Sequence, residues 1–228
     1  MLKPVAVVAG AGPGNGAALA HRFADAGYAV ALLARHRAAT DISDARCYEC
    51  DVSLPVSVER AFVQIRAELG EVDVLLYNAG SGVFADVVSI TPDQFEQAWR
   101  VNAYGSLLCS QQVISSMKAK GRGAIIFIGA TASRRGAIKT AAFAPAKAAQ
   151  RSLAESMARA LWPSGIHVAL IVIDGVVDLP GSRKTMPDKP ADAFVDPRGV
   201  AEIAYQLCIQ DRRAWSFEVE ARPSVEPW

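Results

Sequence analysis

The segment VAVVAGAGPGNG (residues 5–16) decides the fold of this chain. Its apolar, valine-rich first half predicts a buried strand, and the apolar spacing that follows predicts a helix over residues 16–26. Glycines between a strand and a helix let the backbone approach a pyrophosphate, while the helix N-terminus offers N–H groups and partial positive charge. The segment therefore predicts a nucleotide-binding unit, with a plain tight turn as the alternative that the loop alone leaves open.

The same order of strand and helix repeats along the rest of the chain. Further strands are predicted over residues 29–34, 46–52, 72–80, 123–130, 167–174 and 216–222. Further helices are predicted over residues 56–69, 92–119, 142–161 and 197–210. Near-continuous apolar strands separated by helices predict a parallel sheet that is covered on both faces. We therefore expect one α/β domain over residues 1–228, Rossmann-like and doubly wound, with a mostly parallel sheet of about seven strands and helices on both faces.

One stretch with several prolines, residues 179–197, shows neither the apolar period of a helix nor that of a strand. We expect it to be irregular, and long irregular segments in compact domains often act as lids or binding loops. No internal repeat, low-complexity tract or linker divides the chain.

The composition excludes several kinds of partner. The 228 residues are 51% hydrophobic and 21% charged, with a formal net charge of +1, so no overall field attracts nucleic acid or an anionic membrane. The longest apolar stretch, residues 166–174, falls far short of the ~20 residues of a membrane span. The first ten residues lack the features of a targeting segment, so we expect a cytoplasmic protein.

Two of the four cysteines, Cys47 and Cys50, form a C-x-x-C motif. A zinc site would need a second pair with similar spacing, and Cys109 and Cys208 stand apart. The motif lies in a predicted strand, where positions i and i+3 point to opposite faces. We therefore interpret the cysteines as packing residues and predict no metal site.

Several motifs follow the glycine loop in a fixed order. The glycine spacing is Gly10-x-x-x-Gly14-x-Gly16, and the later motifs are Asp51-Val52, Tyr77-Asn78-Ala79-Gly80, Asn102 and Lys147. In this order they resemble the short-chain dehydrogenase/reductase family over about residues 4–178. The resemblance implies a nicotinamide dinucleotide as cofactor. By position, it implies that the cofactor is bound by Gly10, Pro13, Gly14, Asn15, Gly16, Arg35, Arg37, Asp51, Val52, Asn78, Ala79, Gly80, Lys147 and Val176.

The family's active site combines Asn, Ser, Tyr and Lys, and this chain keeps only half of it. Asn102 and Lys147 match, whereas Phe143 stands at the tyrosine position and Ala130 at the serine position. Loss of a general acid such as this tyrosine costs about 10²–10⁴ in reaction rate. The chain resembles a subgroup of the family that has phenylalanine at this position and keeps the lysine. The resemblance implies that the lysine binds the nicotinamide ribose and is not the proton donor.

Other groups are candidates for the missing proton donor. Thr131 neighbours the serine position, and Thr140 lies seven residues before Lys147. Asp174 ends a predicted strand at the edge where α/β proteins bind ligands, and capping of the following turn is its alternative role. A water molecule held on Lys147 is a further candidate. Asp178 is expected near the cofactor phosphates, which its charge would repel.

The second predicted strand ends without the aspartate that NAD-preferring relatives carry. Arg35 follows Ala34, with Arg37 close by, and a guanidinium can pair bidentately with a 2′-phosphate. We therefore expect NADPH (NADP) as the preferred cofactor, with NAD as the alternative. The plain interpretation of both arginines is an exposed loop.

These features favour an NAD(P)-dependent oxidoreductase that moves a hydride to or from a small carbonyl or alcohol substrate, with an altered proton donor. One alternative is an NADP(H)-binding protein without catalysis, acting as a sensor or an assembly subunit. Another is an isomerase- or dehydratase-like enzyme that uses the same pocket. A homodimer or homotetramer is also expected, because two predicted helices correspond to a dimer face in the family. The first of them carries Phe95, Trp99, Leu107, Leu108 and Met117.

Overall fold

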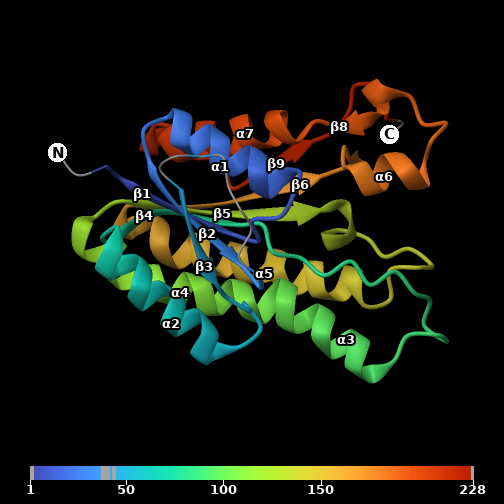
Figure 1. The fold of residues 1–228 in the computed structure, drawn as a ribbon, viewed down its shortest axis with the longest axis horizontal. Helices are drawn as coiled ribbons and strands as arrows, with labels where there is room; N and C mark the ends of the chain where they lie inside the picture. The colour runs from blue at the N-terminus through green and yellow to red at the C-terminus, as the bar shows by residue number, and fades with distance from the viewer. Residues whose placement is uncertain (1–2, 37–41, 43–44, 227–228) are drawn as a thin grey trace.

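Seven parallel strands form the centre of the molecule. The computed structural model describes residues 3–36, 42 and 45–226. The strand order is β3 (Ala45–Glu49), β2 (Ala29–Ala34), β1 (Val5–Ala9), β4 (Val72–Tyr77), β5 (Gly123–Ala130), β6 (Ile166–Ile173) and β9 (Glu218–Ala221). Helices α1 (Asn15–Asp25) and α7 (Pro197–Ile209) cover one face of the sheet (Figure 1). Helices α2 (Pro55–Glu68), α4 (Gly105–Lys120) and α5 (Phe143–Leu161) cover the other.

Alternate residues of each strand enter two separate cores. In β1, Val5 and Val7 pack toward α2, α4 and α5, whereas Ala6 and Val8 pack toward α1 and α7. Because helices cover both faces, the five inner strands are mostly buried, and this explains their near-continuous apolar runs. The edge strands β3 and β9 carry charged residues. The predicted α/β class is confirmed, with a Rossmann-like doubly wound sheet of seven strands. Every pairing between described strands is parallel.

The single helix predicted over residues 92–119 is interrupted in the structure. It consists of α3 (Pro92–Trp99), a π-helical turn η1 (Arg100–Tyr104) and α4. At the end of the π-turn, the Gly105 N–H donates to the Arg100 carbonyl, five residues earlier. The predicted helical span is confirmed, but the apolar period does not reveal the π-turn inside it, which is one residue wider than an α-turn.

The stretch that was expected to be irregular, residues 179–197, contains regular structure. Helix α6 (Pro180–Thr185) and strand β8 (Phe194–Val195) lie in it, and β8 pairs in parallel with β7 (Val176–Val177). These elements have six, two and two residues, so none is long enough to show a period in the sequence.

The observed positions of several side chains can be compared with those expected from the sequence. Cys50 belongs to the core beneath α2, α4 and α5, whereas Cys47 packs on the opposite face, as the strand register predicts. Met117 was assigned to an oligomer face, but it is fully buried within the chain.

No group of three or more potential metal ligands occurs within the described residues. None of the helices in the described ranges has the length and apolar character of a membrane span.

Two glycines with similar backbone angles give a test of the packing. Gly27 and Gly165 have φ values of +87° and +82°, but a Cβ at Gly27 meets nothing within 4 Å, whereas one at Gly165 would overlap the Gly121 carbonyl. We expect Gly27→Ala to lower the free energy of unfolding by about 1–2 kcal/mol, from backbone strain alone. Gly165→Ala should cost about 1–3 kcal/mol more, because of overpacking. Urea denaturation of both variants measures the difference, and equal losses would contradict the predicted clash.

Candidate functional site

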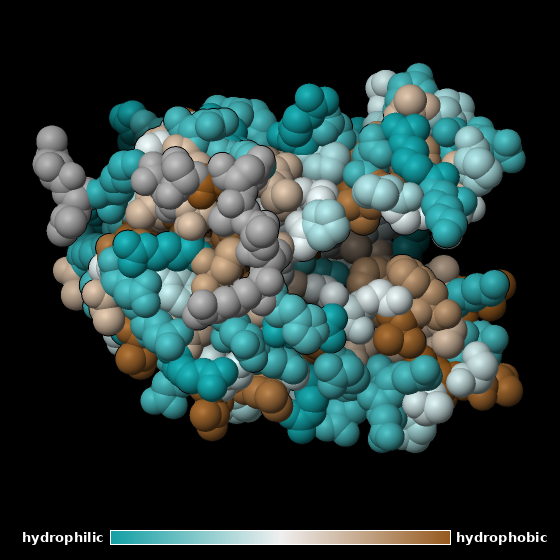
Figure 2. Space-filling view, in the orientation of Figure 1, coloured by the Kyte–Doolittle hydropathy of each residue, from teal (hydrophilic) through white to brown (hydrophobic). Residues whose placement is uncertain are grey.

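The carboxyl ends of the central strands meet at one edge of the sheet, where ligands bind in open α/β proteins. Gly10, Asn78, Thr131 and Asp174 directly follow β1, β4, β5 and β6. Figure 2 shows a hollow on this side, between the layer that carries α6 and the layer that carries α3. A cleft of about 680 Å³ lies at this edge.

The cleft collects most of the residues that the sequence assigned to a cofactor. Its lining includes Gly10, Pro13, Arg35, Asp51, Val52, Asn78, Ala79 and Gly80. It also includes residues that the sequence did not single out, among them Leu33, His36, Ser81, Gln97 and Val101. Gly14, Asn15, Gly16, Lys147 and Val176 are not part of this lining. Arg37 lies outside the described residues.

The glycine loop is held tightly against the end of β4. Gly10 has a φ of +92°, and a Cβ there would lie 2.5 Å from the Ala79 nitrogen. The Asn78 side chain donates from Nδ2 to the Gly10 carbonyl at 2.8 Å. A Cβ on Gly16 would lie 2.5 Å from the same carbonyl, so α1 begins in direct contact with the loop. The backbone surface left at this turn is the kind that receives a phosphate group.

Arg35 and Asp51 also line the cleft. Arg35 follows β2 and is exposed. The Asp51 carboxylate accepts hydrogen bonds from the backbone N–H and the hydroxyl of Ser53, at 2.9 and 2.7 Å. Its backbone N–H donates to the Ser57 hydroxyl at 3.0 Å. The turn at Asp51 is therefore fixed by its own hydrogen bonds, whereas Arg35 is exposed.

Lys147 is buried, with only 5% of the residue exposed, so it is not an ordinary solvated lysine on a helix surface. Its Nζ donates to the Ile128 carbonyl of β5 at 2.9 Å and to Oε1 of Gln150 at 3.0 Å. Burial lowers the pKa of Lys147 from 10.5 to about 8. The amine is therefore held in place and is easier to deprotonate than an ordinary lysine.

Asn102 lies in the π-turn, against which α5, the helix that carries Lys147, packs. Its Nδ2 donates to the carbonyls of Ala98 and Ser81, at 2.8 and 3.3 Å. Its Oδ1 is buried and has no hydrogen-bond partner within the described residues. A Cβ built on Gly80 would lie 3.4 Å from this oxygen and 3.9 Å from the Lys147 Nζ. An amine and an unused acceptor thus both lie close to Gly80, which is itself part of the cleft lining.

Phe143 supplies an aromatic surface where the family has a hydroxyl. Its ring centroid lies 5.9 Å from the Lys147 Nζ and 5.3 Å from the Phe84 ring. Ala130, at the serine position, is the last residue of β5. Neither side chain can donate a proton or a hydrogen bond.

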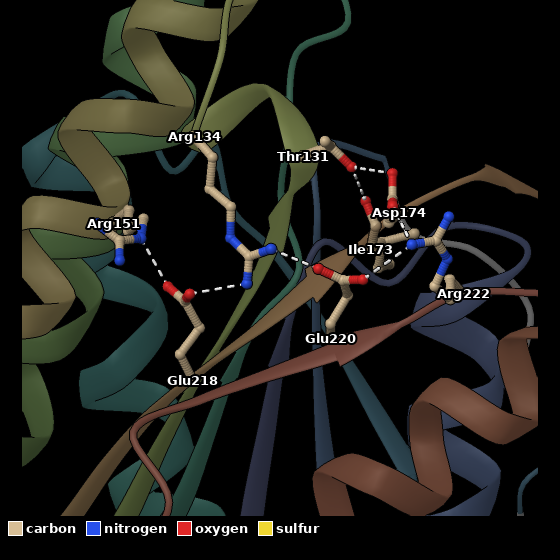
Figure 3. A network of polar contacts seen from close by, with 8 residues as sticks. All are labelled: Thr131, Arg134, Arg151, Ile173, Asp174, Glu218, Glu220 and Arg222. Atoms are coloured by element: carbon tan, nitrogen blue, oxygen red, sulfur yellow. Dashed lines mark hydrogen bonds and ion pairs between the residues drawn. The ribbon is translucent and has the colours of Figure 1, made fainter. Parts of the chain in front are cut away.

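The proposed substitute donors are engaged in other contacts. The Thr131 hydroxyl donates to Oδ1 of Asp174 at 2.6 Å and is 3.2 Å from the Ile173 carbonyl. Asp174 in turn pairs with Arg222 at 3.3 Å (Figure 3). The Thr140 hydroxyl donates to the Ala137 carbonyl and accepts from its N–H. These contacts hold loops together, which is the ordinary role of such residues.

The residues after β6 bring one unexpected side chain to the glycine loop. Gly14 has a φ of +85°, and a Cβ on it would collide with Leu179. No pattern in the sequence predicts this contact, since an isolated leucine in a proline-dotted stretch has no period. Asp178 was expected to repel phosphates, but Arg183 binds it through two hydrogen bonds at 2.7 and 2.8 Å. This ion pair lowers the pKa of Asp178 and offsets its charge.

A family model described as short chain dehydrogenase matches residues 4–189, most of the chain. The chain belongs to this family. A 3-oxoacyl-[acyl-carrier-protein] reductase of Mycobacterium avium is 33% identical over 177 residues, covering 78% of this chain and 68% of the relative. A D-xylose 1-dehydrogenase of Caulobacter vibrioides is 30% identical over 218 residues, covering 90% and 81%.

A solved structure is also similar over nearly the whole length. A metagenomic short-chain oxidoreductase in complex with NADP has a TM-score of 0.81 and 26% identity, with 98% of both chains covered. The relatives of this chain thus include a 3-oxoacyl-[acyl-carrier-protein] reductase and a D-xylose 1-dehydrogenase, two enzymes with different substrates. Family membership by itself does not select a substrate.

The lowered pKa of Lys147 has a consequence for stability. Between about pH 8 and pH 10.5, the unfolded chain holds a proton on this amine that the folded chain has released. Stability should therefore rise with pH in this window, relative to Lys147→Met, by up to about 1.4 kcal/mol per pH unit. Urea denaturation of both proteins at several pH values measures this, because their difference cancels the other titrating groups. A difference that stays constant with pH would contradict a proton loss at Lys147.

Proposed function

We propose that this short-chain dehydrogenase is an NADP(H)-dependent oxidoreductase that moves a hydride to or from a small carbonyl or alcohol substrate. In this proposal it acts as a homodimer or homotetramer and takes its proton from solvent. The observation that carries the proposal is that the Lys147 amine and the unpartnered Asn102 oxygen both lie close to Gly80, a residue of the cleft lining. Bound NADPH would supply the hydride.

The residues of the cleft fit such a cofactor. The close packing of Gly10 and Gly16 leaves backbone, not side chain, toward a pyrophosphate. Asp51 and Val52 would receive the adenine, and Arg35 would pair with a 2′-phosphate. Asn78, Ala79 and Gly80 continue this surface toward the nicotinamide side, with Val176 as a backbone contact for the carboxamide.

Lys147 would hold the nicotinamide ribose. Two internal acceptors fix its amine, at the Ile128 carbonyl and the Gln150 amide, so a third ammonium hydrogen remains for a ribose hydroxyl. Asn102 Oδ1 can accept a hydrogen bond from a ligand hydroxyl near Gly80. Solvent is the proton source in this proposal, because the hydroxyls of Thr131 and Thr140 bind other groups.

The second candidate function is an NADP(H)-binding protein without catalysis, a sensor or an assembly subunit. It is favoured by the loss of hydroxyls at Ala130 and Phe143. Nicotinamide absorbance followed with a panel of aldehydes, ketones and enoyl thioesters separates the two. Turnover of any panel member supports the oxidoreductase, whereas tight binding with no turnover supports the second candidate.

We expect Arg35 to determine the preference for NADPH over NADH. Loss of a bidentate, charge-assisted contact should weaken NADPH binding about ten- to a hundredfold in Arg35→Ala, while NADH binding changes little. Isothermal titration with both cofactors measures the ratio. Arg159→Ala serves as the control, since this arginine lies on α5 with 78% of its side chain exposed. Equal affinities in the native protein, or an unchanged preference in Arg35→Ala, would disprove the assignment.

Restoring the two hydroxyls should change the rate of carbonyl reduction and not the affinity for the cofactor. Phe143→Tyr combined with Ala130→Ser places a general acid four residues before Lys147, and we expect carbonyl-reductase activity to rise by about 10²–10⁴. The cofactor dissociation constant should change by less than about threefold, because the proposed cofactor contacts are retained. NADPH oxidation with the carbonyl panel measures the first, and titration measures the second. Phe143→Leu combined with Ala130→Gly is the matched control and should show no gain.

A further inference from the structure

Gln150 is completely buried and joins the two retained active-site residues. Its Oε1 accepts from the Lys147 Nζ at 3.0 Å, and its Nε2 donates to the Asn102 carbonyl at 3.0 Å. The partners fix the orientation of the amide, because a flipped amide would place NH₂ against an ammonium and oxygen against oxygen. Sequence reasoning missed this residue, since one glutamine on a helix carries no pattern.

The position of Gln150 explains how it reaches both partners. It lies three residues after Lys147 on α5, so both side chains are on one helix face. That face packs on the π-turn, from which the Asn102 carbonyl points to the amide. On the other side, the lysine reaches the Ile128 carbonyl of β5. One amide thereby connects α5, the π-turn and the sheet.

We infer that Gln150 is the positioning residue of Lys147. Its amide fixes the amine between β5 and the π-turn, so that the amine and Asn102 Oδ1 both lie close to Gly80. The binding part of this inference rests on the proposed function. The geometric part concerns only the chain's own residues.

An amide suits this position because it does not titrate. It provides one acceptor for the amine and one donor for the carbonyl at every pH. Burial is the cause of the lowered pKa of Lys147, with no charged side chain contributing. A carboxylate in place of the amide would hold the lysine protonated, and an apolar side chain would remove an acceptor from it.

Ligand binding gives the first test. NADP⁺ contains the nicotinamide ribose, whereas adenosine 2′,5′-bisphosphate contains the 2′-phosphate without that ribose. We expect Gln150→Met to weaken NADP⁺ binding about tenfold and to leave the bisphosphate unchanged. Lys147→Met should show the same split, with a loss of about ten- to a hundredfold, and adding Gln150→Met to it should have no further effect.

The opposite results would overturn the inference. Equal weakening of both ligands by Gln150→Met would indicate a general structural role. Additive losses in the double variant would show that the two residues act independently. Gln64→Met, an exposed position on α2, controls for the chemical change itself.

A titration of the free protein keeps the inference testable if the proposed function fails. With lysine labelled with carbon-13, the ε-carbon resonance of Lys147 reports its protonation, and Lys147→Met identifies that resonance. We expect Gln150→Glu to move this titration to higher pH and Gln150→Met to move it to lower pH, with Gln64→Met unchanged. If the native protein binds no NADP⁺, the proposed function is wrong, and the titration still decides the role of Gln150. A Lys147 titration that is the same in both Gln150 variants would disprove that role.

Discussion

A buried ammonium group must find acceptors for its hydrogens, and this requirement at Lys147 organises the candidate site. An unpaired buried charge is among the most costly features of a folded protein. The acceptors come from different parts of the chain, one from the carboxyl-terminal part of strand β5 and one from α5 itself. The same amide that receives the amine also holds the π-turn, so the position of Asn102 is coupled to that of the lysine. The sheet, the π-turn and α5 therefore depend on one polar cluster.

The substitutions at residues 130 and 143 leave this framework intact. Phe143 occupies the first turn of α5 and packs on Phe84, while Lys147 keeps its register one turn later. An aromatic pair in this position offers no hydrogen-bond donor or acceptor. The architecture that positions a cofactor is therefore separable, in physical terms, from the groups that move a proton. This separation is the reason that family membership and catalytic power are distinct questions for this chain.

The sequence predicted those features that follow from local pattern. The strands show as continuous apolar runs, the glycine loop as a spacing, and the Phe143–Lys147 pair as a helical repeat. The missed features depend on partners distant in sequence. The role of Gln150 depends on its hydrogen bond to Asn102, 48 residues away, and that of Leu179 depends on its contact with Gly14. The ion pair of Asp178 was not foreseen, because its partner Arg183 belongs to a helix too short to recognise.

The π-turn has a consequence for how this chain can change over generations. Each residue of an α-helix turns the chain by about 100°, so the wider turn at residues 100–104 sets the rotation of α4 relative to α3. Loss of one residue there would rotate the core face of α4, with Cys109, Val113 and Met117, away from the sheet. It would also displace the Asn102 carbonyl from its amide partner. Selection should therefore act against insertions and deletions in this stretch and tolerate them in the exposed loops. The length of the stretch should then be more strongly conserved than its side chains.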